Sequence, residues 1–292
     1  MIEFLRALAN PDLPFLRYAL LAGLLASVAF GIVGSFVVVR RISSLAGAIS
    51  HSVLAGIGAS LYLQVAAGCP WCRPLYGALA AGLVAALAIG WVSLRARQRE
   101  DTVIGALWAV GMAVGLLFIA RTPGAVDPLS FLFGNILLIS RADLTLILAL
   151  DATVVIAALL FYHRFLAISF DEEFARARGI RVELYHLLLL CLIALSIVLL
   201  VRVVGIILVI GLFTLPAGLA GLFARRLWQM MLAAIAWGMV FVTLGLGVSY
   251  ARDLPTGPVI IVIAALAYLA GLLVRRLLVS RARSAAATQI AP

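Results

Sequence analysis

Hydrophobic residues lie in long, nearly continuous runs along the chain, and short polar turns separate one run from the next. A helix needs about 20 apolar residues to cross the hydrocarbon core of a bilayer, and nine runs have that length. Residues 129–140 form a shorter apolar run, which predicts a re-entrant or surface segment. The predicted spans are residues 16–39, 45–67, 74–94, 102–120, 142–162, 183–201, 203–224, 229–250 and 257–275.

Composition places the chain among integral membrane proteins. Hydrophobic residues make up 65% of its 292 residues, and the mean hydropathy is +1.21. Soluble domains contain about 45–50% apolar residues, and a soluble core of this size could not bury so much apolar surface. We therefore predict an all-α integral membrane protein. It would be a helical bundle of about nine transmembrane helices, forming one domain over residues 1–292.

All 22 basic residues are arginine, and the net charge is +10. The absence of lysine excludes a Walker A nucleotide site and a Schiff base, since both need a lysine amine. If ATP is used, another chain must bind it. The arginines flank the apolar runs, which indicates orientation in a lipid bilayer rather than nucleic-acid binding. Fifteen lie on the side of Arg40-Arg41, so we expect that side to be cytoplasmic, with the N-terminus outside.

The longest polar stretch on this inner side contains FDEEFARARG, which predicts a short helix over residues 171–179. The acids Asp171, Glu172 and Glu173 lie in its first turn and Arg176 near its end, as the helix dipole favours. Gly179 is a plausible C-cap. Two interpretations are open: a solvated linker between two spans, or a docking site for a soluble partner.

One histidine stands out because it lies within a run of small and apolar residues, SLAGAISHSVLAGIG. On a helix, His51 shares its face with Gly47, Ala55 and Gly58, so the imidazole would stand in a gap or against a neighbouring backbone. Imidazole is a good ligand for borderline divalent ions such as zinc. The alternative is a histidine that is hydrogen-bonded between helices.

Three other features are candidates for chemistry. Asp151 lies near the middle of the fifth predicted span, where a carboxylate is costly; it could contact a transported ion or pair inside the bundle. In the outer loop GCPWCRP, Cys69 and Cys72 could form a disulfide or a transient metal-docking pair. Arg202 divides the run 183–224 and predicts a hairpin at the outer interface.

Five blocks together resemble the permease subunits of ABC importers for zinc, manganese and iron, the ABC-3 family. The resemblance covers about residues 20–275, and the blocks are FVVVRRISSLAGAISHSVLAGIG, EDTVIGALWAVGMAVGL, FLFGN, SFDEEFARARGI and VRVVGIILVIGLFTLPAGLA. It implies the type II importer permease fold, two permease copies forming the pathway, ABC ATPase subunits at the cytoplasmic face and an extracytoplasmic metal-binding protein. The implied location is the bacterial inner (plasma) membrane.

The resemblance also implies roles for particular residues. The helix at 171–179 maps onto the coupling helix that the ATPases grip, and His51 onto the metal pathway. Many members have an aspartate four residues before this histidine, where this chain has Gly47. A water, Asp151 or another acid could supply the missing oxygen ligand. Asn135, in FLFGN, could line the outer half of the pathway or cap a helix.

These observations predict a permease that moves a divalent metal ion, uses no cofactor of its own and leaves ATP hydrolysis to a partner. Loss of a hard oxygen ligand at position 47 favours zinc over manganese or iron. One alternative is a permease of the same architecture for a metal chelate or a corrin-type ligand. Another is a secondary transporter, for which only Asp151 could serve as a coupling acid. An intramembrane enzyme is disfavoured, because the spans hold no nucleophile–base or acid pair.

Overall fold

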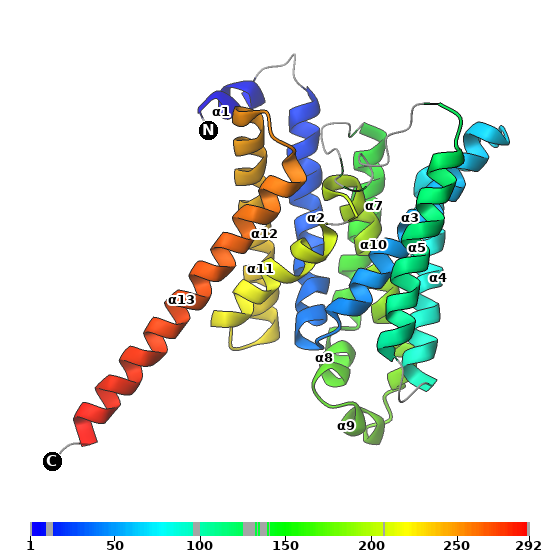
Figure 1. The fold of residues 1–292 in the computed structure, drawn as a ribbon. Coiled ribbons are helices and arrows are strands. Elements are labelled where there is room, and N and C mark those ends of the chain that lie inside the picture. The colour runs from blue at the N-terminus through cyan, green and yellow to red at the C-terminus, as the bar shows by residue number, and fades with distance from the viewer. Residues whose placement is uncertain are drawn as a thin grey trace.

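The computed structural model describes residues 2–9, 14–95, 100–124, 132, 134, 139, 141–206 and 208–290, and its elements are α-helices (Figure 1). In chain order they are α1 (Ile2–Ala9), α2 (Pro14–Val39), α3 (Ser43–Ala66), α4 (Pro74–Arg95), α5 (Glu100–Arg121), α7 (Arg141–Leu160), α8 (Tyr162–Phe170), α9 (Glu172–Ala177), α10 (Val182–Val204), α11 (Val209–Phe223), α12 (Leu227–Arg252) and α13 (Thr256–Ile290).

Eight of these helices are long and apolar enough to cross a membrane: α2, α3, α4, α5, α7, α10, α12 and α13. They coincide with eight of the nine predicted spans, and the prediction of an all-α membrane bundle is confirmed. The remaining span corresponds to α11, which has only 15 residues. At 1.5 Å per residue α11 is about 22 Å long, shorter than the hydrocarbon core.

The division between α10 and α11 differs from the prediction. Helix α10 continues through Arg202 to Val204, and the chain leaves the helix at Gly205, which has φ of +88°. The prediction that Arg202 ends the helix was wrong because arginine is a good helix former, whereas glycine adopts positive φ without a steric penalty. Gly205 and Ile206 are buried, so this non-helical backbone lies inside the protein.

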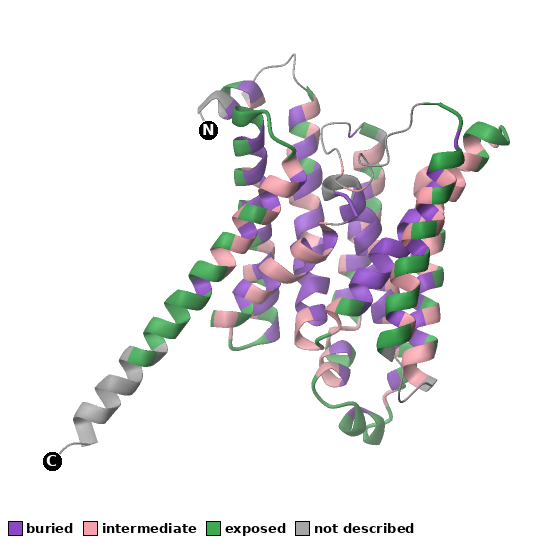
Figure 2. Ribbon diagram, in the orientation of Figure 1, coloured by how far each residue is buried: buried purple, intermediate pink, exposed green. Residues whose placement is uncertain are grey.

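Helix packing divides the bundle into two groups. Helix α3 packs mainly against α5 and α4, α2 packs against α12, α11 and α7, and α10 contacts members of both groups. Buried positions concentrate between these helices, whereas the outward faces of α4, α5 and α13 are exposed (Figure 2). The exposed side chains on α13 are largely leucines, including Leu266, Leu273 and Leu277, which suits contact with lipid rather than water.

Small residues allow α3 to lie very close to its neighbours. A Cβ atom added at Gly58 would collide with the backbone of Gly115 on α5, and one added at Gly56 would collide with the backbone of Gly77 on α4. Without a strong hydrophobic driving force in lipid, such close backbone approach is a main source of helix association. The glycines therefore fix α3 between α4 and α5, and with it the position of His51.

Candidate functional site

His51 lies on α3 and is almost fully buried, with 4% of its surface exposed. Its imidazole ring stacks on the indole of Trp108 from α5, with ring centroids 4.6 Å apart and an interplanar angle of 21°. We expected the imidazole to face a gap or a neighbouring backbone. It faces an aromatic side chain instead, because α5 supplies the bulk that α3 lacks. The sequence reasoning did not single out Trp108.

Trp108 also occupies the space beside Gly47. A Cβ atom at position 47 would lie 2.6 Å from Cζ3 of Trp108 and 3.0 Å from Cδ1 of Ile210 on α11. A real side chain does not approach so closely, so any residue larger than glycine requires the indole to move. Where many members of the family have an acid at position 47, this chain has a glycine, and Trp108 on α5 occupies the space beside it. The indole therefore fills the gap in which a water could have bound.

The polar atoms of His51 and its neighbours differ in whether they have a hydrogen-bond partner. Nδ1 of His51 is buried and has no hydrogen-bond partner in the described part of the chain. The Ser50 hydroxyl donates to the carbonyl of Ile206 at 2.9 Å, and the Ser52 hydroxyl lies 2.8 Å from the Ala48 carbonyl within α3. Buried polar atoms in proteins are nearly always paired, so an unpaired imidazole nitrogen makes His51 a candidate ligand site.

The Ser50 contact explains how the break between α10 and α11 is tolerated. Backbone groups outside a helix must find other partners at membrane depth. The Ile206 carbonyl lies in that break and accepts its bond from Ser50, the neighbour of His51. The residue in the sequence that indicates this break is Gly205, within VRVVGIILV, rather than Arg202.

Asp151 lies in a different part of the bundle. It is buried, with 6% exposed, and its Oδ1 accepts a hydrogen bond from the backbone N–H of Ala29 on α2 at 3.0 Å. Helix α7 packs against α2 and α10, whereas α3 packs against α5 and α4. Within the described ranges, His, Cys, Asp and Glu form no group of three or more that could hold a metal ion. Asn135 lies outside the described residues.

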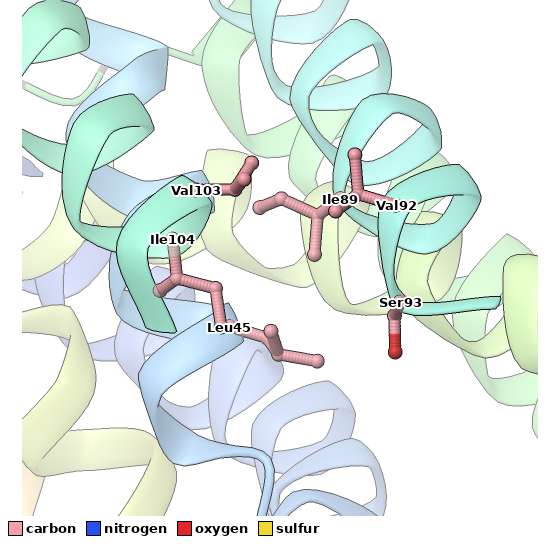
Figure 3. A pocket seen from close by; sticks show the side chains of 6 residues that line it. All are labelled: Leu45, Ile89, Val92, Ser93, Val103 and Ile104. Atoms are coloured by element: carbon pink, nitrogen blue, oxygen red, sulfur yellow. The ribbon is translucent and has the colours of Figure 1, made fainter. Parts of the chain in front are cut away.

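Apolar side chains close the space between His51 and the predicted cytoplasmic side. One helical turn before Trp108 on α5 lies Ile104, and six residues before His51 on α3 lies Leu45; both are buried. With Ile89, Val92, Ser93 and Val103 they line a crevice of about 10 Å³, enough for no more than about one water. Figure 3 shows these side chains lining the crevice between α3, α4 and α5.

A larger polar cavity lies beyond this apolar layer. It has a volume of about 390 Å³ and lies between the α2–α3 turn, the adjoining ends of α4 and α5, α9 and α10. Its polar lining includes Arg40, Ser44, Asp101, Glu172 and His186. Both ring nitrogens of His186 and Nη1 of Arg40 are buried and have no hydrogen-bond partner in the described part of the chain.

The short polar helix is present as α9, over Glu172–Ala177. Asp171 caps its N-terminus, where the carboxylate accepts from the N–H of Phe174 at 2.9 Å. Gly179, with φ of +77°, ends it, and the N–H of Ile180 bonds to the carbonyl of Ala175 at 3.0 Å, as in a Schellman motif. The predicted helix and its glycine C-cap are therefore confirmed, with Asp171 and Gly179 as its flanking residues.

The side chains of α9 face two ways. Glu172 points towards the bundle, where it forms an ion pair with Arg40, and Arg176 pairs with Glu183 of α10 at 2.9 Å. Glu173 is exposed. Phe174 is 55% exposed, and the guanidinium of Arg178 lies 5.2 Å from its ring centroid. An exposed aromatic ring beside an arginine is typical of protein-binding surfaces.

In the loop between α3 and α4, predicted to lie outside, Cys69 and Cys72 form a disulfide, and Trp71 between them is 82% exposed. The bonded cysteines carry no free thiolate, so in this state they are not metal ligands. The remaining cysteine, Cys191, is free and partly buried within α10.

Residues 12–275 match the ABC 3 transport family. The chain is 39% identical to a probable metal transport system membrane protein of Chlamydia trachomatis, over 90% of each chain. It is 35% identical to the manganese transport system membrane protein MntC of Halalkalibacterium halodurans, over 86% of this chain and 84% of that protein. Among solved structures it is similar to PsaBC from Streptococcus pneumoniae in complex with Fab, with a TM-score of 0.82, 31% identity, and coverage of 93% of this chain and 95% of that chain.

Proposed function

This chain belongs to the ABC 3 transport family and is a multi-pass membrane permease of an ABC metal-ion import system whose ATPase activity resides in a partner subunit, and we propose that it passes a bare zinc ion along α3 at His51. The observation that carries the proposal is the buried, unpaired Nδ1 of His51, in a structure whose described His, Cys, Asp and Glu residues form no group of three or more that could hold a metal ion. Imidazole without hard oxygen ligands suits zinc better than manganese.

Manganese is the second candidate, because relatives at 35% identity and below are named for manganese transport. The two ions differ in the ligands they prefer, since manganese favours carboxylate oxygens. Asp151 would be a carboxylate of this kind, but its Oδ1 bonds to the α2 backbone. Zinc therefore remains the first candidate.

In the proposed mechanism, an extracytoplasmic binding protein delivers the ion to a pathway between two copies of the permease. The apolar layer of Leu45, Ile89 and Ile104 closes the inner end at rest. ATP-driven movement of the partner ATPases would displace α9 and open this layer. The ion would then pass from His51 into the polar cavity, where charged side chains can replace part of its hydration.

The ATPase is proposed to dock on the exposed side of α9. Phe174 offers an aromatic anchor that Arg178 covers on one side, and Phe170, just before α9, is 71% exposed. Such aromatic anchors commonly dominate interface energies. Substitution of Phe174 by Asp should therefore reduce co-purification of the ATPase, with no change in the amount of permease in the membrane.

The test of the cargo is metal accumulation in cells that carry either the wild-type chain or His51→Ala, with matched expression and with the metals resolved by mass spectrometry. We expect zinc accumulation to fall by at least about tenfold, because the pathway would lose the unpaired imidazole nitrogen of His51. His163→Ala is the matched control, since His163 is an exposed histidine on α8. A fall in manganese alone would identify manganese as the cargo, and unchanged accumulation of every metal would refute a role for His51.

A further inference from the structure

An ion pair connects α9 to the turn between α2 and α3. Nη2 of Arg40 lies 2.5 Å from Oε1 of Glu172, and these residues are 132 positions apart in the sequence. The Arg40 side chain is only 8% exposed, whereas that of Glu172 is 46% exposed. The other ion pair of α9, Arg176–Glu183, is exposed by more than half on both sides. The Arg40–Glu172 pair therefore belongs to the class whose loss is costly, and the Arg176–Glu183 pair does not.

Arg40 lies in a tight corner that ties two membrane helices together. Helix α2 ends at Val39 and α3 begins at Ser43. The N–H of Ile42 bonds to the Val37 carbonyl at 3.1 Å and that of Arg41 to the Val38 carbonyl at 3.2 Å, with Arg41 at φ of +58°. This is the hydrogen-bond pattern of a Schellman motif. A force applied to the Arg40 side chain therefore acts directly on the inner end of α3.

The inner end of α3 carries the parts of the pathway that have to move. Leu45, in the apolar layer, is in the first turn after the corner, and His51 lies eight residues from Ser43, or about 12 Å along the helix. We infer that Arg40 is a positioning residue that transmits displacement of α9, through Glu172, to the inner end of α3 and so to the layer that closes the pathway. The inference rests on the proposed function, because it takes α9 to be the contact with the ATPase.

The surroundings of the pair leave it room to shift. Arg40 and Glu172 both line the polar cavity of about 390 Å³, and Nη1 of Arg40 has no partner in the described part of the chain. Burial lowers the pKa of Arg40, and the charge and hydrogen bond of Glu172 oppose this effect. The guanidinium thus depends on one carboxylate for its stability, and that carboxylate is carried by α9. A displacement of Glu172 should draw Arg40 with it rather than leave a buried charge alone.

The test uses the assembled transporter, in which the permease is co-expressed with its ATPase and binding protein. The main variant is Glu172→Gln, since Glu172 is half exposed and its loss should not prevent folding. We expect co-purification of the ATPase to stay within about twofold of wild type, because Phe174 remains. We expect zinc uptake to fall by about tenfold, while basal ATP hydrolysis continues without stimulation by the loaded binding protein.

Two further variants make the result specific. The exchange Arg40→Glu with Glu172→Arg restores an ion pair of opposite polarity and should recover at least about a third of the uptake lost in either single charge reversal. Glu183→Gln removes the exposed ion pair of the same helix and should leave uptake within about twofold of wild type.

Three outcomes would overturn the inference: wild-type coupling in Glu172→Gln, no recovery in the exchange variant, or a loss of uptake that only parallels a loss of ATPase binding. Failure of the proposed function would look different. In that case Phe174→Asp would leave ATPase co-purification unchanged, or His51→Ala would leave metal uptake unchanged, whatever the result at Glu172.

Discussion

Asp151 and His51 are two of the ionisable side chains buried in the membrane-spanning part of this protein, and they differ in what their polar atoms contact. Asp151 on α7 accepts a hydrogen bond from the backbone of α2. His51 on α3 stacks on Trp108 and leaves Nδ1 unpaired within the described structure. Buried polar groups that have partners stabilise a fold, whereas those without partners require another explanation. The comparison favours a structural role for Asp151 and a transport role for His51.

The largest effect is expected from placing a side chain at position 47. Gly47→Asp would drive its Cβ into the Trp108 ring and bury a carboxylate in a space that the indole fills. Overpacking costs about 1–3 kcal/mol, and an unpaired buried charge adds several more. We expect Gly47→Asp to lower the melting temperature of the purified permease strongly and to abolish uptake.

The double variant Gly47→Asp with Trp108→Ala sharpens this test. Removing the indole should restore the folded protein and place a carboxylate one helical turn from His51. Because manganese favours oxygen ligands, we expect the double variant to accumulate more manganese relative to zinc than wild type. Gly105→Ala is the control, since a Cβ there meets nothing within 4 Å. Wild-type stability of Gly47→Asp would contradict the packing argument.

Substitution of Asp151 should lower stability and leave uptake nearly unchanged, whereas substitution of His51 should lower uptake. Asp151→Ala removes the acceptor for the Ala29 N–H, and the loss of a buried hydrogen bond to a charged group costs about 1.5–3 kcal/mol. If the carboxylate has only a structural role, uptake per folded molecule should stay within about twofold of wild type. Thermal unfolding in detergent and metal uptake normalised to membrane-inserted protein separate the two effects.

Asp151→Asn is the matched variant, since an amide oxygen can still accept the hydrogen bond. It should keep both stability and uptake near wild type. If Asp151→Asn instead abolished uptake while the permease remained folded, Asp151 would be a ligand of the transported ion, and the distinction drawn between the two residues would be lost.

The membrane spans and the short polar helix could be predicted because their signals are local. Long apolar runs determine the spans, and the acids, arginines and Gly179 determine α9 within ten residues. The contact between His51 and Trp108 could not be found in this way. It depends on the rotation of α5 against α3, which glycine contacts such as Gly58 with Gly115 set through space.

The same limit applies to Arg40 and Arg202. Both are arginines near the end of a predicted span, so the sequence pattern leads to the same prediction for both, namely that the helix ends there. Helix α10 passes through Arg202 and ends at Gly205, whereas Arg40 lies in a corner and pairs with a residue 132 positions away. Charge at the end of a span predicts orientation, but it does not say where a helix ends or which distant carboxylate an arginine meets.

A smaller effect is expected from Ser50, whose hydroxyl satisfies the Ile206 carbonyl in the break between α10 and α11. Ser50→Ala leaves that buried carbonyl without its donor, which costs about 1–3 kcal/mol. Ser35→Ala is the control, because the Ser35 hydroxyl bonds to the Gly31 carbonyl within its own helix at 2.7 Å. We expect Ser50→Ala to melt at a lower temperature than Ser35→Ala; equal melting temperatures would show that the break does not depend on α3.

The smallest effect is expected at the loop after α3, where Cys69 and Cys72 are bonded to each other and lie beyond the helix end at Ala66, away from His51. The paired substitution Cys69→Ser with Cys72→Ser opens a short loop, which costs at most about 2 kcal/mol of local stability. Zinc uptake should stay within about twofold of wild type if these cysteines have only a structural role. Thiol labelling of whole cells, before and after a reductant, would report whether the wild-type pair is oxidised. A tenfold loss of uptake in the serine variant, with the loop reduced in wild-type cells, would instead make this pair a metal-docking site at the mouth of the pathway, because free thiolates bind zinc tightly.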